Sequence, residues 1–170
     1  DGLVDLINER GQYTVNILGN SDKNCVVKGA KAISFADTEK VTEAIADADA
    51  VFTSVGGKNL GDLVPLLVAG IEKKAQKDGN LNVVTCENWK LPATILKNGV
   101  EEAISESAKE YFHTHVGMTE AVIMRSAIES DPELLKQDPL VVNVQDFWEL
   151  PVDKSRIVGD MPDMQGLKLM

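Results

Sequence analysis

Two short stretches of polar or glycine residues each follow a predicted strand, where they could contact a bound ligand. They are Thr53-Ser54-Val55-Gly56-Gly57 and Thr85-Cys86-Glu87-Asn88, and each follows a short apolar run. In an open parallel sheet, ligands bind outside the carboxyl ends of the strands. If the two apolar runs are neighbouring parallel strands, both stretches lie at such an edge.

The first stretch could bring the backbone close to a nucleotide. Gly56 and Gly57 would let the chain approach a ribose or phosphate, and the helix that follows would offer unpaired N–H groups. The same glycines also suit an ordinary turn between a strand and a helix. Lys58 could attract an anion or could be a solvated lysine at a helix start, so both interpretations stay open.

The second stretch carries a side chain suited to hydride transfer. The Asn88 amide could donate a hydrogen bond to a substrate oxygen and so stabilise a developing alkoxide, although asparagine is also a common helix N-cap. Glu87 could contact a ribose or a substrate, or could complement the positive end of a helix dipole. Residue types alone do not choose between these roles.

The histidines and cysteines of the sequence do not indicate a metal site or a reactive thiol. His113 and His115 would face the same side of a strand, but no carboxylate or thiol with ligand spacing joins them, so we expect structural histidines and no metal. Cys25 and Cys86 lie in separate strand-like segments and are expected to be reduced in a cytoplasm. Arg125 lies in an apolar run and needs a partner, either an ion pair or a substrate.

Composition and charge argue against nucleic acid and a membrane as partners. The chain has 170 residues, of which 44% are hydrophobic and 26% charged, and its formal net charge is −10. Without a basic surface it is not expected to bind nucleic acid non-specifically. No apolar run approaches the roughly 20 residues that span a bilayer, so no membrane segment is expected either. The charge does not exclude an anionic ligand, since a helix N-terminus can bind phosphate without any Lys or Arg.

Hydrophobic patterning predicts an α/β fold. Short apolar strands alternate with amphipathic helices, which indicates parallel strands joined by right-handed crossovers, with some antiparallel pairing among the later strands of the same sheet. Helices are predicted at 3–9, at 60–77, in a stretch that follows Asn88 and ends near 104, and around Tyr111 and Phe112. A further helix is predicted to begin after an Asp37 N-cap and to turn Val41, Ala44, Ile45 and Ala48 toward the core. The strands are predicted at 13–17 and 25–28 as a hairpin, then at 32–35, 50–55, 82–86, 116–124 and 140–144.

With these residues considered together, the sequence resembles the mannitol dehydrogenase family, especially its mannitol-1-phosphate 5-dehydrogenase branch. The similarity runs through nearly the whole chain, in the order of the family, and each short motif alone is weak. The matching stretches are Ile7-Asn8-Glu9-Arg10, Tyr13-Thr14-Val15, 50–56, 81–88, His115-Val116-Gly117, and Val152-Asp153-Lys154 through Pro162 and Gly166.

The resemblance implies an NAD-dependent, metal-independent oxidoreductase that interconverts a sugar alcohol, or its phosphate, with the ketose. The substrate pair would be mannitol 1-phosphate and fructose 6-phosphate. It also implies that Asn88 places its amide near the reacting oxygen, and that Ser54, Val55 and Gly56 line the cofactor near the nicotinamide ribose. From its own place at the strand end, Glu87 is expected to be a further cofactor contact. A hexuronate reductase of the same family, acting on tagaturonate or fructuronate, is an alternative, as is a non-catalytic binding module.

Several family features are missing from residues 1–170. No Gly-x-Gly-x-x-Gly loop appears, nor the catalytic Lys with its Asn and His at family spacing, and Met124 stands where the branch usually has Asp. The apolar stripe at Leu3 to Ile7 has no cap before it, as if the chain began inside an element. We therefore expect a partial Rossmann-like NAD-binding domain over 1–170, without the first strand, the glycine-rich loop or the helical catalytic domain, and inactive by itself.

Overall fold

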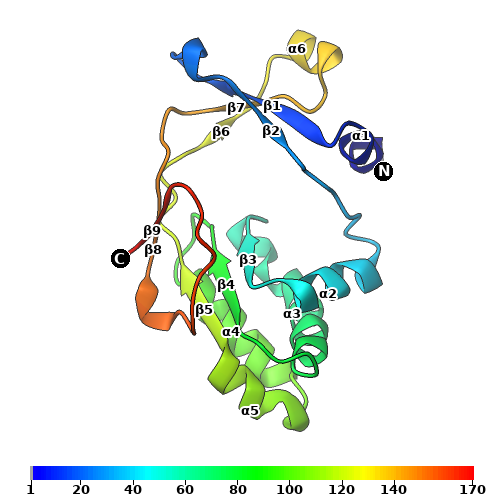
Figure 1. The fold of residues 1–170 in the computed structure, drawn as a ribbon, viewed down its shortest axis with the longest axis vertical. Helices are drawn as coiled ribbons and strands as arrows, with labels where there is room; N and C mark the ends of the chain where they lie inside the picture. The colour runs from blue at the N-terminus through cyan, green and yellow to red at the C-terminus, as the bar shows by residue number, and fades with distance from the viewer. Residues whose placement is uncertain (1) are drawn as a thin grey trace. The chain divides into compact units, whose positions relative to one another are not determined.

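A computed structural model of the chain describes residues 2–170, and Figure 1 traces their course. The residues form two compact units, each assembled from two separate stretches of sequence. The first unit contains the residues up to Ala36 together with Met124–Trp148, and the second contains Asp37–Ile123 together with Glu149–Met170. Parallel strands flanked by helices give a mixed α/β fold, as predicted.

The first unit is built around a four-stranded sheet with the order β2-β1-β7-β6. Its helices and strands are α1 (Gly2–Arg10), β1 (Gln12–Ile17), β2 (Cys25–Lys28), β6 (Ala127–Ile128), α6 (Pro132–Gln137) and β7 (Val142–Val144). The predicted hairpin is confirmed, because β2 pairs antiparallel with β1, whereas β7 pairs with the other edge of β1 in parallel. Val15, Ile17 and Val144 form its small buried core.

The Asp146 carboxylate joins the β1–β2 turn to the end of this unit. It accepts hydrogen bonds from Lys23 Nζ at 2.8 and 3.0 Å, from Trp148 Nε1 at 2.6 Å and from Asn20 Nδ2 at 3.1 Å. The Lys23 ammonium, followed by the Trp148 and Asn20 donors, lowers the pKa of Asp146 to about 2. The carboxylate therefore stays ionised in this turn down to acid pH.

This lowered pKa predicts a pH-dependent stability. The folded pKa lies below the ordinary value of 3.8, so the bonds of Asp146 stabilise the fold above that value and are lost as the pH falls toward 2. Asp146→Asn should unfold at lower urea than the unmodified chain at pH 6, and the difference should disappear near pH 2. Circular dichroism measures both midpoints, and Asp22→Asn in the same turn is the control. A difference that does not change with pH would contradict the prediction.

The second unit contains a three-stranded parallel sheet with the order β3-β4-β5. Its elements are α2 (Thr38–Asp47), β3 (Ala50–Thr53), α3 (Leu60–Lys74), β4 (Leu81–Thr85), α4 (Pro92–Ala103), α5 (Glu106–His115), β5 (Val116–Glu120), β8 (Leu150–Val152) and β9 (Leu167–Leu169). All five residues of β4 are buried, as expected for a central parallel strand. Alternate side chains of β4 face opposite layers, since Leu81 and Val83 join the core formed with the helices while Val84 packs with Val152.

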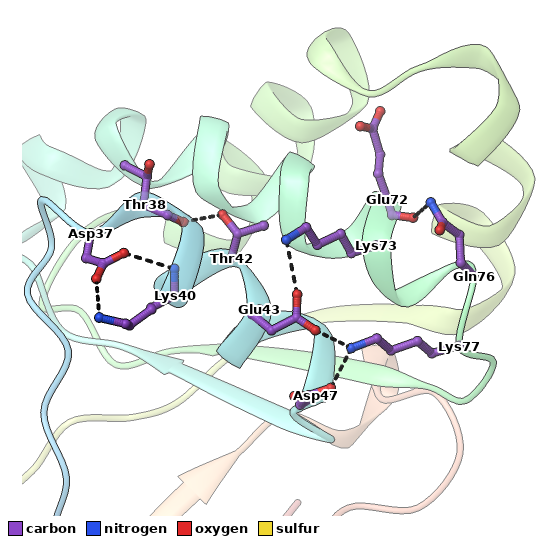
Figure 2. Close-up of polar contacts among 10 residues, drawn as sticks. All are labelled: Asp37, Thr38, Lys40, Thr42, Glu43, Asp47, Glu72, Lys73, Gln76 and Lys77. Carbon is purple, nitrogen blue, oxygen red and sulfur yellow. Dashed lines mark hydrogen bonds and ion pairs between the residues drawn. The ribbon is translucent and has the colours of Figure 1, made fainter.

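Helices α2 and α3 pack closely and are joined by ion pairs at their surface (Figure 2). A Cβ added to Gly70 of α3 would lie 2.4 Å from Cγ2 of Ile45, so only glycine permits this approach. Glu43 of α2 pairs with Lys73 at 3.0 Å and with Lys77 at 2.6 Å. The predicted Asp37 cap is confirmed, because its side chain accepts from the Lys40 N–H at 3.2 Å. None of the helices within residues 2–170 has the length and apolar character to cross a membrane.

The last part of the second unit, Glu149–Met170, which we call the late segment, is held to the sheet through a buried asparagine. Asn82 of β4 is fully buried, donates from Nδ2 to the Val158 carbonyl at 3.0 Å and accepts from the Val158 N–H at 2.9 Å. Gly117 of β5 lies under this contact: a Cβ there would be 2.2 Å from the Asn82 Oδ1 and 2.6 Å from the Arg156 carbonyl. The absence of a side chain at Gly117 lets the late segment reach the sheet.

Some predicted elements are wrong in detail. Residues 32–35 form no strand, and Ala44 of α2 is exposed, while Thr42 and Ala46 are buried in its place. The strand predicted at 116–124 ends at Glu120. The later strands do not all extend one sheet, since β7 pairs with β1 and β6 pairs with β7, while β5 pairs with β4 and β8 pairs with β9.

Candidate functional site

The two stretches singled out in the sequence lie next to each other in the second unit. β3 and β4 are parallel neighbours in a register that sets Thr53 opposite Thr85, so both strands end at the same edge of the sheet. Beyond the strands, the Cys86 N–H donates to the Thr53 carbonyl at 2.9 Å. Residues 54–57 and 86–88 therefore form adjoining loops at the carboxyl edge, where a parallel sheet binds its ligands.

Glu87 fastens these two loops together. It is buried, and Oε1 accepts from the Val55 N–H at 2.8 Å and the Thr53 hydroxyl at 3.2 Å. Oε2 accepts from the Gly56 N–H at 2.9 Å. Both oxygens are thus bonded within the protein, and the carboxylate fixes the backbone of the turn after β3. The cofactor contact suggested for Glu87 stays a prediction, and fixing this turn is the role that its bonds support.

Replacing Glu87 tests this arrangement. Glu87→Gln keeps one acceptor oxygen but turns an amide N–H₂ toward a backbone donor, so we expect the free energy of unfolding to fall by about 1–2 kcal/mol. Urea denaturation followed by circular dichroism measures the change. Glu102→Gln, on the exposed side of α4, removes the same charge and should change stability little. Equal stability of the Glu87 variant and the unmodified chain would contradict the assigned role.

The turn after β3 requires its two glycines for different reasons. Gly56 has a φ of +82°, a conformation that side chains disfavour. Gly57 faces an aromatic ring, because a Cβ there would lie 2.1 Å from the Trp89 ring. Asn59 completes the turn by donating from Nδ2 to the Val55 carbonyl at 2.7 Å. The turn is closed on the Trp89 side, while Ser54, Gly56, Lys58 and Asn59 are exposed.

Asn88 has a free amide beside this turn. Its side chain is exposed and makes no hydrogen bond to any residue in the described range 2–170. It is not a helix N-cap, because α4 begins only at Pro92 and its cap residue is Leu91, with a φ of +49°. The alternative role weighed for Asn88 in the sequence is therefore wrong. The amide is therefore available to a ligand, and it lies next to Glu87, whose carboxylate is held by hydrogen bonds.

Cys86, between the strand and Glu87, is not a reactive thiol. Burial, with the nearby Glu87 carboxylate as the second cause, raises its pKa to about 11. The thiol therefore stays protonated at neutral pH, and the thiolate that nucleophilic chemistry needs is scarce. Neither cysteine forms a disulfide.

One residue at this edge of the sheet was missed by sequence reasoning. Glu120 ends β5, opposite Thr85 in the register, and its Oε1 is buried without a hydrogen-bond partner among residues 2–170. The available signal was a carboxylate at the end of the otherwise uncharged run from Val116. A buried carboxylate oxygen lacking a donor is costly, so Glu120 is a third candidate polar group at the edge.

The histidines are arranged differently from the prediction. They belong to helix α5, where His115 stacks on Tyr111 with ring centroids 5.0 Å apart and His113 Nε2 lies 3.4 Å from Glu101. Within residues 2–170, no three side chains of the metal-binding types are grouped to hold an ion. Both histidines thus contact neighbouring side chains of this chain, and the expected lack of a metal stays a prediction.

Arg125 lies in the first unit and has an incomplete set of partners. Its guanidinium stacks over Trp148 at 4.7 Å, and Nε donates to the Gln145 carbonyl at 3.2 Å. Nη2 is buried with no partner among the described residues, and the side chain borders an apolar cavity of about 600 Å³ lined also by Tyr13 and Val142. The ion pair suggested for Arg125 is absent from residues 2–170.

Comparisons with known proteins agree with the sequence resemblance. A family model described as the mannitol dehydrogenase Rossmann domain matches residues 1–166. A mannitol-1-phosphate 5-dehydrogenase from Thermoanaerobacter pseudethanolicus is 34% identical over 169 residues, which cover 99% of this chain and 43% of that relative. The chain thus spans less than half the length of this curated relative.

Two solved structures share the fold. A D-sorbitol dehydrogenase in substrate-free form superposes with a TM-score of 0.72 at 15% identity, over 95% of this chain and 43% of that one. A Pseudomonas fluorescens mannitol 2-dehydrogenase, in a ternary complex with NAD and D-mannitol, gives a TM-score of 0.72 at 13% identity, over 93% and 41%. At these identities the likeness shows the fold alone, and it agrees with the Rossmann domain that the family model describes.

Proposed function

Because the chain belongs to the mannitol dehydrogenase family, we propose that it is the cofactor-binding part of an NAD-dependent polyol dehydrogenase. The substrates are mannitol 1-phosphate and fructose 6-phosphate, as the name of its 34%-identical relative suggests. The enzyme works in the cytoplasm, in keeping with two cysteines that form no disulfide. The free amide of Asn88 beside the turn fixed by Glu87 is the observation that carries the proposal.

Each residue of the edge has a role in this proposal. Ser54, Val55 and Gly56 line the nicotinamide ribose, and Glu87 holds their backbone in place. Asn88 donates a hydrogen bond to the reacting oxygen of the substrate, which stabilises negative charge as it develops. NAD, when bound, supplies the acceptor and donor of the hydride.

We further propose that the chain is one part of a longer enzyme. Two observations support this: the chain covers 43% of the relative, and the outer edge of β3 pairs with no strand in residues 2–170, while Phe52 on that strand is 38% exposed. A preceding strand with its glycine-rich loop would pair there and bind the pyrophosphate. The general base that accepts the alcohol proton would come from a following helical domain.

Calorimetric titration with NADH tests both parts of the proposal. The 170-residue chain should bind NADH weakly or undetectably, because the backbone donors for the pyrophosphate are missing, while a protein extended at both ends should bind it and reduce fructose 6-phosphate. Tight NADH binding or turnover by the 170 residues alone would contradict the proposal that other parts of the enzyme supply the pyrophosphate loop and the general base. An extended protein that reduces tagaturonate or fructuronate instead would make it a hexuronate reductase, and one that binds NADH without turnover would make it a binding module.

A further inference from the structure

A second cavity lies in the second unit, away from the carboxyl edge of the sheet. It measures about 500 Å³, and we call it the cationic cavity. Its lining comes from α4, α5, the first half of β5 and the segment after β8. The residues that line it are Thr94, Lys97, Asn98, Glu101, Phe112, His113, Val116, Met118, Arg156 and Val158.

One wall of the cationic cavity is a polar stripe along helix α4. Thr94, Lys97, Asn98 and Glu101 are spaced at i, i+3, i+4 and i+7, which sets them on one face of the helix. Opposite this face, Arg156 reaches the stripe, with its Nη1 3.4 Å from the Thr94 hydroxyl. The cavity is thus surrounded by hydroxyl, amide, ammonium and guanidinium groups that can all donate hydrogen bonds.

The two strong cations of the cavity form no ion pair within the described residues, although the Asp153 carboxylate acts on Arg156 at longer range. Neither Lys97 nor Arg156 has a carboxylate within 4.0 Å among the described residues, although the protein carries 27 acidic and 17 basic side chains. The one carboxylate in the lining, Glu101, is already in contact with His113 at 3.4 Å. Two positive charges without an ion pair within 4.0 Å therefore lie around the cationic cavity of an acidic protein.

The floor of the cavity is apolar. Phe112, Val116 and Met118 are 2%, 8% and 4% exposed, so they form a packed base beneath the charged rim. A bare inorganic ion would use only the rim, whereas an organic anion would also cover this base. Guanidinium and ammonium groups together favour the several oxygens of a phosphate.

From these contacts we propose that the cationic cavity binds a small anion that carries a phosphate group. Lys97 and Arg156 pair with the phosphate oxygens, Thr94 and Asn98 donate further hydrogen bonds, and the carbon skeleton of a phosphate ester rests on Phe112. This site is separate from the turn after β3. β5 runs parallel to β4, and the two β5 residues that line the cavity, Val116 and Met118, lie about 7–13 Å along the strand from its carboxyl end.

Binding is measured with the 170-residue chain by NMR titration, using inorganic phosphate and fructose 6-phosphate at constant ionic strength. We expect saturable shifts in the amides of residues 94–101 and 156–158 for both probes. Lys97→Ala and Arg156→Ala should each weaken binding about threefold to fivefold, as for exposed ion pairs, and the double variant should abolish it. Tighter binding of fructose 6-phosphate would identify the ligand as an ester, and equal binding would identify it as free phosphate.

A charge-matched control separates a site from a general effect of charge. Lys154→Ala removes a cation two residues from Arg156, outside the cavity lining, and should leave phosphate binding unchanged. Arg156→Lys keeps the charge and should recover part of the affinity. The proposal is overturned if no saturable binding appears by about 50 mM phosphate, or if Lys154→Ala weakens binding as much as Lys97→Ala does.

Discussion

Replacing Asn88 with alanine in the complete dehydrogenase is expected to lower kcat about 10²- to 10³-fold, as when one donor to a developing oxyanion is removed. KM for the polyol and the affinity for NADH should change little, since in the proposed mechanism the amide acts only on the reacting oxygen, and the turn after β3 stays fixed by Glu87. Steady-state kinetics in both directions, with NADH binding measured separately, would show this pattern.

Two comparisons make the Asn88 result specific. Lys90→Ala, two residues further along the same exposed loop, should leave kcat within about twofold of the unmodified enzyme. The side chain of Asn88 has no bond to a described residue, so its loss should leave the unfolding midpoint unchanged. If Asn88→Ala loses stability instead of turnover, or retains full kcat, the amide has no part in the reaction.

Gly117→Ala is expected to destabilise the second unit by about 3 kcal/mol, the upper range for overpacking a core. The added methyl would fall 2.2 Å from Asn82 Oδ1 and 2.6 Å from the Arg156 carbonyl, so the late segment must move off the sheet. That movement also breaks the two hydrogen bonds between Asn82 and Val158, leaving a fully buried amide unpaired. Urea denaturation of the 170-residue chain measures the loss.

Two further variants locate the cause of this loss. Gly61→Ala lies in helix α3 with open space around the added methyl, and should be neutral or stabilising by up to about 1 kcal/mol. Adding Asn82→Ala to Gly117→Ala removes one of the clashing atoms but not the Arg156 carbonyl, so it should restore little or none of the loss. If Gly117→Ala is as stable as Gly61→Ala, the close approach of the late segment is not what requires glycine.

Local patterns predicted the elements better than their pairing. A β-branched and aromatic run ending at Gly56-Gly57 indicated β3, and a Val-rich run ending at Glu87-Asn88 indicated β4. Asp37 indicated the start of α2, because such signals depend on neighbours in the sequence. The parallel pairing of β1 with β7 joins residues such as Val15 and Val142, and a single sequence carries no local signal for it. The predicted single sheet was wrong for this reason.

In the candidate site, too, local sequence patterns predicted the position but not the contacts between distant residues. Its place at the ends of β3 and β4 followed from the strand pattern, because parallel strands end at one edge. The bonds of Glu87 to the Val55 and Gly56 amides depend on the exact register and could not be predicted from residue type. The same holds for Asn88, whose freedom from the helix cap depends on α4 starting at Pro92.

The order of the two units along the chain bears on how the protein is made. Each unit is interrupted by part of the other, so a ribosome delivers most of the second unit before β7 has emerged to complete the first. The second unit is still incomplete at that stage, because Val158 follows its hydrogen-bond partner Asn82 by 76 residues. Until synthesis passes that point, Asn82 and Val84 on β4 remain uncovered by the late segment, and nascent chains would expose them to chaperones and to aggregation.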